Sequence, residues 1–160
     1  MPGPIATIGS MHVCPMCSGT VPHVGGPVAQ SSAPGVLING KPIALMGDIC
    51  TCVGPPDMIV QGEAGVTVNG IPVATVGCMT AHGGSISMGE IGVTITSNTP
   101  NPTVTMPLSQ IPFPKITIKD KILASVSGNT DKLKEAQENQ EKVKEEAKKH
   151  GYLMNLDFSI

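Results

Sequence analysis

Hydrophobic and polar positions in the first hundred residues follow one short pattern that the chain repeats. An apolar run leads to Asn-Gly, and a Pro two residues later begins a second apolar run that ends at Gly. The pattern is clearest in GVLINGKPIALMG, residues 35–47, and GVTVNGIPVATVG, residues 65–77. Because Asn-Gly accepts positive φ at both central positions of a tight turn, each copy predicts a β-hairpin.

A third copy is divided between two distant parts of the chain. PIATIGSMHVC, residues 4–14, aligns with PVATVGCMTAH, residues 72–82, and supplies the second half of the pattern. GVTI, residues 92–95, supplies the first half. Three copies predict a mostly β body with pseudo-threefold symmetry, in which one hairpin pairs the two ends of the body.

The pattern changes near residue 100. Five prolines favour an extended chain there, namely Pro100, Pro102, Pro107, Pro112 and Pro114. Alternating apolar residues then predict a strand within residues 115–126. Residues 131–149 are rich in Lys, Glu, Gln and Ala and predict one helix, and residues 152–160 are apolar again. We therefore expect a body over residues 1–98 and an extension over residues 99–160.

The predicted helix carries a thin apolar stripe, formed by Leu133, Ala136, Val143 and Ala147. A narrow stripe on a highly charged helix is typical of a helix that faces water and is supported by Glu–Lys pairs. The same stripe also fits a coiled coil or a helix that docks on a partner. The sequence leaves both interpretations open.

Composition indicates that the body has a thin core. The chain of 160 residues has 19 Gly and 15 Pro but no Trp, one Tyr and two Phe, and all three aromatic residues lie outside the repeats. Aliphatic side chains bury less apolar area each than aromatic ones. Such a body is expected to need a further constraint, and a bound metal is one means of supplying it.

The two regions differ in their content of charged residues, and the net charge does not suggest binding to nucleic acid. Residues 1–100 carry one Lys and four acidic residues, whereas residues 101–160 carry nine Lys and eight acidic residues, with a formal net charge of −2 overall. We see no secretory signal peptide and no apolar run as long as a membrane span. We therefore expect a protein made in a cytosol, where cysteines are more often metal ligands or inert thiols than disulfides.

Histidine and cysteine residues gather at the ends of the repeats. Five residues after the last Gly of each copy, the chain has Cys14, Cys52 and His82. Equivalent positions of a threefold set converge near one axis, and thiolates with imidazoles suit tetrahedral Zn²⁺. His23 and His82 both have Gly-rich neighbours that let the backbone crowd round an ion. The remaining cysteines are expected to be small buried core residues, namely Cys17, Cys50 and Cys78.

Signals for catalysis are weak. We find no Ser-His-Asp spacing, phosphate-binding loop or pair of carboxylates, and so expect no enzyme. Cys14 and Cys17 form a Cys-x-x-Cys pair, which leaves a stand-alone metal or redox protein as an alternative. A metal held by four protein ligands has no open position for water and is therefore structural.

Several spaced motifs resemble those of PAAR-repeat proteins. They are, in order, PIATIGSMHVCPM, PHVGGP, GKPIALMGDICTCVGPPD, NGIPVATVGCMTAHGG and GVTIT, and they cover about residues 1–98. The Pro-Ala-Ala-Arg quartet itself is degenerate, since PIAT, PIAL and PVAT stand in its place. The resemblance implies a small cone that sharpens the trimeric spike of a contractile injection system, most familiarly type VI secretion, for membrane puncture.

The resemblance also implies a ligand set and partners. The family's structural zinc, bound by three His and one Cys, maps onto His12, His23, His82 and Cys52, with Cys14 as the alternative to His12. A trimeric, VgrG-like spike protein is expected at the base of the cone, and a target membrane is met only transiently.

The extension lies outside the resemblance. We expect it to attach an effector or adaptor through its apolar end, at Tyr152, Leu153, Leu156 and Phe158. A brace that folds back along the cone or spike is one alternative, and a small secreted effector whose active part is the extension is another. The protein is expected to stay in the bacterial cytoplasm before firing and then to be secreted with the spike.

Overall fold

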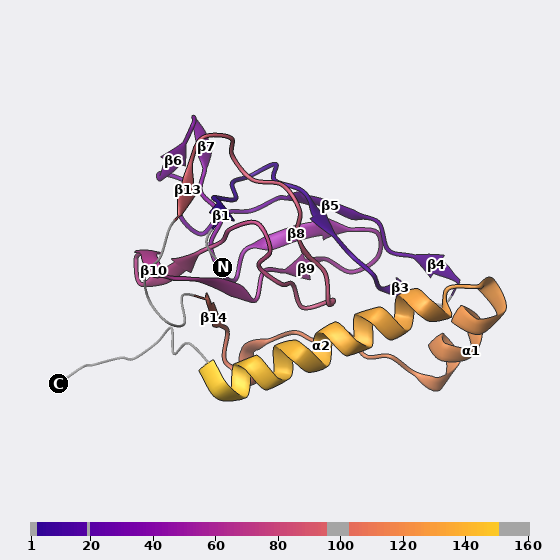
Figure 1. The fold of residues 1–160 in the computed structure, drawn as a ribbon. Coiled ribbons are helices and arrows are strands. Elements are labelled where there is room, and N and C mark those ends of the chain that lie inside the picture. The colour runs from indigo at the N-terminus through magenta and orange to yellow at the C-terminus, as the bar shows by residue number, and fades with distance from the viewer. Residues whose placement is uncertain (1–2, 19, 96–102, 151–160) are drawn as a thin grey trace.

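The computed structural model describes residues 3–18, 20–95 and 103–150, which form a β body and a helical extension (Figure 1). The strands of the body are short and pair in two- and three-stranded sheets. They are β1 (Gly3–Pro4), β2 (His12–Val13), β3 (Cys17–Ser18), β4 (Val21–Pro22), β5 (Gly25–Val28), β6 (Leu37–Ile38), β7 (Lys41–Pro42), β8 (Ile49–Cys52), β9 (Asp57–Met58), β10 (Gln61–Val68), β11 (Ile71–Val73), β12 (Ser85–Ile86) and β13 (Thr94–Ile95). The prediction of a mostly β body is confirmed.

Each of the three predicted hairpin units forms. β6 pairs with β7 around Asn39-Gly40, and β10 pairs with β11 around Asn69-Gly70. The two Asn residues have φ of 51° and 53°, and the Gly residues after them have φ of 79° and 80°. This is the left-handed backbone that Asn and Gly tolerate best. In the third unit β1 pairs with β13, with Gly3 opposite Ile95, so the two ends of the body complete one unit.

A closed ring of backbone hydrogen bonds joins the three units at their axis. The N–H of Ala6 donates to the carbonyl of Ala74, that of Ala44 to Ala6 and that of Ala74 to Ala44, each over 2.9 Å. All three alanines are fully buried. The core around them contains three larger side chains, Val28, Ile59 and Ile86. Because three segments of the chain meet at the axis, only a small side chain fits there. The repeated Ala of PIAT, PIAL and PVAT supplies it.

Over residues 103–150, the extension begins with a strand and contains one helix more than the sequence predicts. β14 (Thr103–Thr105) pairs with β10, and a 3-10 turn, η1 (Leu108–Gln110), follows. The strand predicted within residues 115–126 is wrong, because α1 (Ile118–Ser127) is a helix. The Thr117 hydroxyl accepts from the N–H of Asp120, whose carboxylate accepts from the N–H of Thr117. This reciprocal cap begins the helix and outweighs the short apolar alternation.

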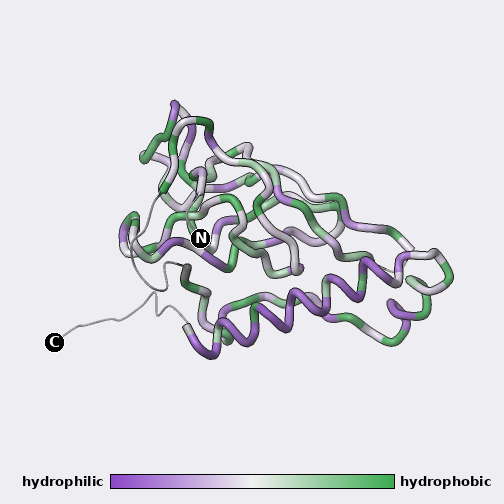
Figure 2. Tube along the Cα trace, viewed as in Figure 1, coloured by the Kyte–Doolittle hydropathy of each residue, from purple (hydrophilic) through white to green (hydrophobic). Residues whose placement is uncertain are grey.

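α2 (Thr130–His150) covers the predicted helix of residues 131–149 and lies along the body (Figure 1). Most of α2 is hydrophilic in Figure 2, so the contact depends on its narrow apolar stripe. Leu133 and Ala136 are buried beside Met16, while Val143 and Ala147 are buried beside Met46, Val60 and Met106. The stripe therefore docks on the body of the same chain. The predicted contact residues of the apolar end, Tyr152, Leu153, Leu156 and Phe158, lie outside the described residues.

Neither α1 nor α2, over the ranges that the structure describes, has both the length and the apolar character that a membrane crossing needs.

Replacement of Ala44 by Leu should destabilise the body by about 1–3 kcal/mol, because extra carbon atoms at the axis force neighbouring side chains and backbone apart. Ala64→Leu is the matched control, since Ala64 lies on β10 with its side chain exposed. The control should change the free energy of unfolding by less than about 0.5 kcal/mol. Urea denaturation of the two variants measures both effects, and equal stability of the two would contradict the axial packing.

Candidate metal centre

Four potential metal ligands from separate parts of the body converge on one point. Cys14 follows β2, His23 lies between β4 and β5, Cys52 ends β8, and His82 lies in the turn before β12. One ligand atom from each side chain lies within 4.8 Å of the other three. Both histidines are buried, and both cysteines are partly buried. A single ion at this point would join segments that are far apart in the chain.

The distances between these ligand atoms fit a tetrahedral ion. The Cys14 Sγ lies 3.7 Å from the His23 Nδ1 and 3.6 Å from the His82 Nδ1. The Cys52 Sγ lies 3.5 Å from the His23 Nδ1. Tetrahedral bonds of about 2.3 Å to sulfur and about 2.0–2.1 Å to nitrogen place the two atoms about 3.5–3.6 Å apart. The cluster could therefore hold a metal ion with little rearrangement.

Two glycines let the chain close round the cluster. A Cβ on Gly25 would clash with the carbonyl of His12, and a Cβ on Gly84 would clash with the carbonyl of Val13. Gly25 begins β5, which contacts β2, and Gly84 directly precedes β12, which pairs with β2. The Gly-rich neighbours of His23 and His82 thus serve close backbone packing beside the candidate ligands.

Asp57 is a buried carboxylate that adjoins the cluster. Its Oδ2 lies 3.4 Å from the His12 Nε2 and 3.8 Å from the His82 Nδ1, and its Oδ1 accepts from the backbone N–H of His82 over 3.0 Å. The other ring nitrogen of His12, Nδ1, lies 2.8 Å from the carbonyl oxygen of Gly26. Oxygen atoms of Asp57 and Gly26 thus lie near the two ring nitrogens of His12, which favours its protonated form. His12, Cys14 and Asp57 also form a second group of close potential ligand atoms.

The pKa shifts agree with a charged His12 paired with Asp57. Burial opposes charge on His12, but the Asp57 carboxylate and the Gly26 carbonyl outweigh burial and raise its pKa. Burial would raise the pKa of Asp57, but its contacts with His12, with the Thr80 side chain and with the backbone N–H of His82 hold it below its usual range. The two side chains therefore form a buried ion pair beside the cluster.

The imidazoles of the cluster itself are neutral. Burial lowers the pKa of His23, and the nearby His82 lowers it further. Burial also lowers the pKa of His82 by more than Asp57 raises it. Neutral imidazole is the form that binds a metal. Burial raises the pKa of the Cys14 and Cys52 thiols, so a metal ion would have to displace their protons on binding.

The structure brings together three of the four ligands that the resemblance implies, His23, Cys52 and His82. Cys14, the alternative ligand, completes the group, as the spacing of the repeats favours. His12 lies beside them and faces Asp57. Asp57 is not among the predicted site residues, although it is one of only four acidic residues in residues 1–100 and follows Cys52 by five positions.

The other cysteines lie in the core, as predicted. Cys50 and Cys78 belong to the axial core, and Cys17 packs beside α1 and α2. Burial raises the pKa of Cys50 to about 12, which makes its thiol inert.

Exchange of Cys14 for Ser should remove most of the bound metal from the purified protein, because a thiolate ligand is lost. His12→Ala should retain the metal yet lower the free energy of unfolding by about 3 kcal/mol, because Asp57 is left buried without its cation. Elemental analysis and urea denaturation of both variants test this assignment. Full metal content in Cys14→Ser together with loss of the metal in His12→Ala would show that His12 is the ligand and Cys14 is not.

The comparisons with known proteins point to one family. No curated protein matches the sequence. Residues 18–88 match the family model of the PAAR motif. The match contains His23, Cys52 and His82 and both complete hairpin units, while residues 4–14 and 92–95 add the divided third unit. The three units round one axis and the Cys and His cluster among them agree with a PAAR motif over this part of the chain.

Proposed function

We propose that this protein is the tip of the trimeric spike of a contractile injection system of the type VI kind, and that it holds a structural zinc ion. The ring of Ala6, Ala44 and Ala74 carries the proposal. Because the ring gives one chain threefold backbone symmetry, that chain can sit on a threefold trimer and still end in a single point. The PAAR motif supports a spike-tip role in general, and proteins with this motif are structural components of the spike.

The proposed base of the tip is the end where the hairpin units meet. β6, β7 and β13 lie together at one end of the body, and β3 and β4 lie at the other (Figure 1). The Asn39 Nδ2 donates to the carbonyl of Ile91 over 3.4 Å, which joins the turn of one unit to the start of another. Leu37 is 55% exposed and Ile91 is 93% exposed at this end. Exposed apolar side chains that gather at one end favour a contact with another protein.

Zinc is the metal that this set of ligands favours. Two thiolates and two imidazoles form a soft, tetrahedral set, which suits Zn²⁺ better than the oxygen-seeking Mg²⁺ or Ca²⁺. Two thiolates also neutralise a divalent cation, while His12 neutralises Asp57, so the buried centre as a whole carries no net charge. Four protein ligands leave no position for water, and the ion would therefore cross-link a thin core without catalysing a reaction.

Asp substitutions at the base should weaken binding to the VgrG-like spike trimer by about tenfold or more, because a charge would be buried at the contact. Leu37→Asp and Ile91→Asp are the variants to test. Val126→Asp is the control, since Val126 is 80% exposed on α1, which contacts β3 at the other end. Titration of the purified trimer measures the three affinities. Wild-type affinity in both base variants would refute the proposed orientation.

The apolar end of the extension is the proposed attachment site for an effector or adaptor. Deletion of residues 152–160 removes Tyr152, Leu153, Leu156 and Phe158 and leaves α2 intact. The shortened protein should still bind the spike trimer but should recover less of a cargo protein in pull-downs. Unchanged recovery of cargo would contradict this role.

A further inference from the structure

α2 contacts the turn that carries one of the proposed metal ligands. The Gln140 Nε2 donates to the backbone carbonyl of His82 over 3.2 Å. The neighbouring Asn139 Nδ2 donates to the carbonyl of Gly83 over 2.7 Å. Gln140 is only 5% exposed, so its amide is a buried polar group whose hydrogen bonds matter for stability.

The turn and the helix are packed as closely as their backbones allow. Gly83 has φ of 89°, and a Cβ at this position would lie 2.6 Å from the carbonyl oxygen of Ala136 on α2. The turn itself is closed by the N–H of Gly83, which donates to the carbonyl of Thr80 over 3.0 Å. The helix therefore fixes the position of this turn as well as covering it.

His82 is thus held from two sides. Its backbone N–H donates to Asp57 in the body, and its carbonyl accepts from Gln140 in the extension. Two fixed backbone groups on one residue restrict the direction of its side chain, which points its Nδ1 at the Cys14 Sγ. Groups that orient a ligand in this way usually have large effects on metal affinity.

We propose that Asn139 and Gln140 are positioning residues of the metal centre, and that metal binding and the docking of α2 stabilise each other. The proposal rests on the metal site proposed above. It makes the extension a part of that site although the PAAR motif ends at residue 88. Coupling of this kind is reciprocal, because a helix that favours the bound metal must itself be favoured by that metal.

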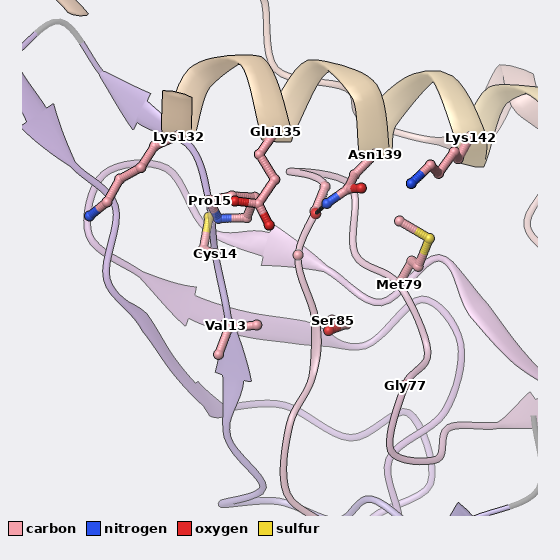
Figure 3. A pocket seen from close by; sticks show the side chains of 12 residues that line it. Val13, Cys14, Pro15, Gly77, Met79, Ser85, Lys132, Glu135, Asn139 and Lys142 are labelled. Carbon is pink, nitrogen blue, oxygen red and sulfur yellow. Dashed lines mark hydrogen bonds between the residues drawn. The ribbon is translucent and has the colours of Figure 1, made fainter. Parts of the chain in front are cut away.

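The cavity beside the site shows where the coupling would act. A cavity of about 510 Å³ lies between the body and α2 (Figure 3). Val13, Cys14 and Ser85 line it from the body, and Glu135 and Asn139 line it from α2. The proposed ligand Cys14 also lines this cavity, so α2 forms one wall of the space beside the centre.

Metal release is the first test. The full-length protein is loaded with Co²⁺, whose thiolate absorption bands report the ligands, and release to a chelator in excess is followed with time. Gln140→Met and Asn139→Ala each remove one donor and should speed release by about tenfold, the lower end of the usual effect of such residues. Gln137→Met lies on the same helix and is the matched control, with release expected to stay at the wild-type rate.

The reciprocal test uses the wild-type protein and therefore does not depend on how the variants fold. Removal of the metal should speed amide hydrogen exchange in α2 more than in β6 and β13, which lie at the end of the body opposite β3 and β4 (Figure 1). Release rates within twofold of wild type in both variants would overturn the proposal, as would equal changes of exchange in α2 and in β6 and β13. Failure to bind Co²⁺ at all would overturn the metal site itself and this inference with it, whereas normal binding with unchanged release would overturn this inference alone.

Discussion

The ring of hydrogen bonds between Ala6, Ala44 and Ala74 is the constraint on which the rest of the structure depends. Each bond joins a different pair of units, so no unit can leave without breaking two of the three. A buried backbone N–H must find an acceptor, and here each alanine finds one in the neighbouring unit. The short strands of the body could not satisfy these groups within a unit. The ring therefore explains how two-residue strands produce a defined body.

Threefold symmetry applies to the backbone more strictly than to the side chains. In each unit, the residue directly after the last glycine accepts a hydrogen bond through its side chain. The donor is the backbone N–H of the residue three positions earlier. Ser10 uses its hydroxyl, Asp48 its carboxylate and Cys78 its thiol. The position five residues after that glycine likewise has Cys14, Cys52 and His82. The symmetric backbone thus offers equivalent positions, and different residues at these positions give the candidate metal centre its mixture of Cys and His.

Features that belong to the repeat could be predicted from the sequence, including the pairing of β1 with β13, whereas contacts between distant segments outside the repeat could not. The Asn-Gly turns and the spacing from glycine to ligand are local, and they gave the hairpins and the convergence of Cys14, Cys52 and His82. The His12 and Asp57 pair joins residues whose separation obeys no repeat, so nothing in the pattern connects them. For α1, the Thr117 and Asp120 of the cap are visible in the sequence, but the short apolar alternation beside them is typical of a strand.

The docking of α2 on the body could be predicted from the sequence only in part. Its apolar stripe was apparent, but the surface that receives it comes from methionines scattered along the chain, among them Met16, Met46 and Met106. Flexible Met side chains adapt to an irregular surface and leave no periodic trace in the sequence. The stripe alone therefore could not distinguish a contact with another protein from a contact with the body.

The pairing of β1 with β13 determines when the body can fold. Gly3 lies opposite Ile95, so the third unit cannot close during synthesis until almost the whole body has left the ribosome. Two units are local hairpins and can form early, whereas β1 must wait for β13, the strand of the body that is made last. Contacts between such distant residues slow folding, and until they form, the unpaired strand edges remain open to other chains. The body therefore gains its threefold shape in one late step, and a chain that ends before β13 would be left with an open side.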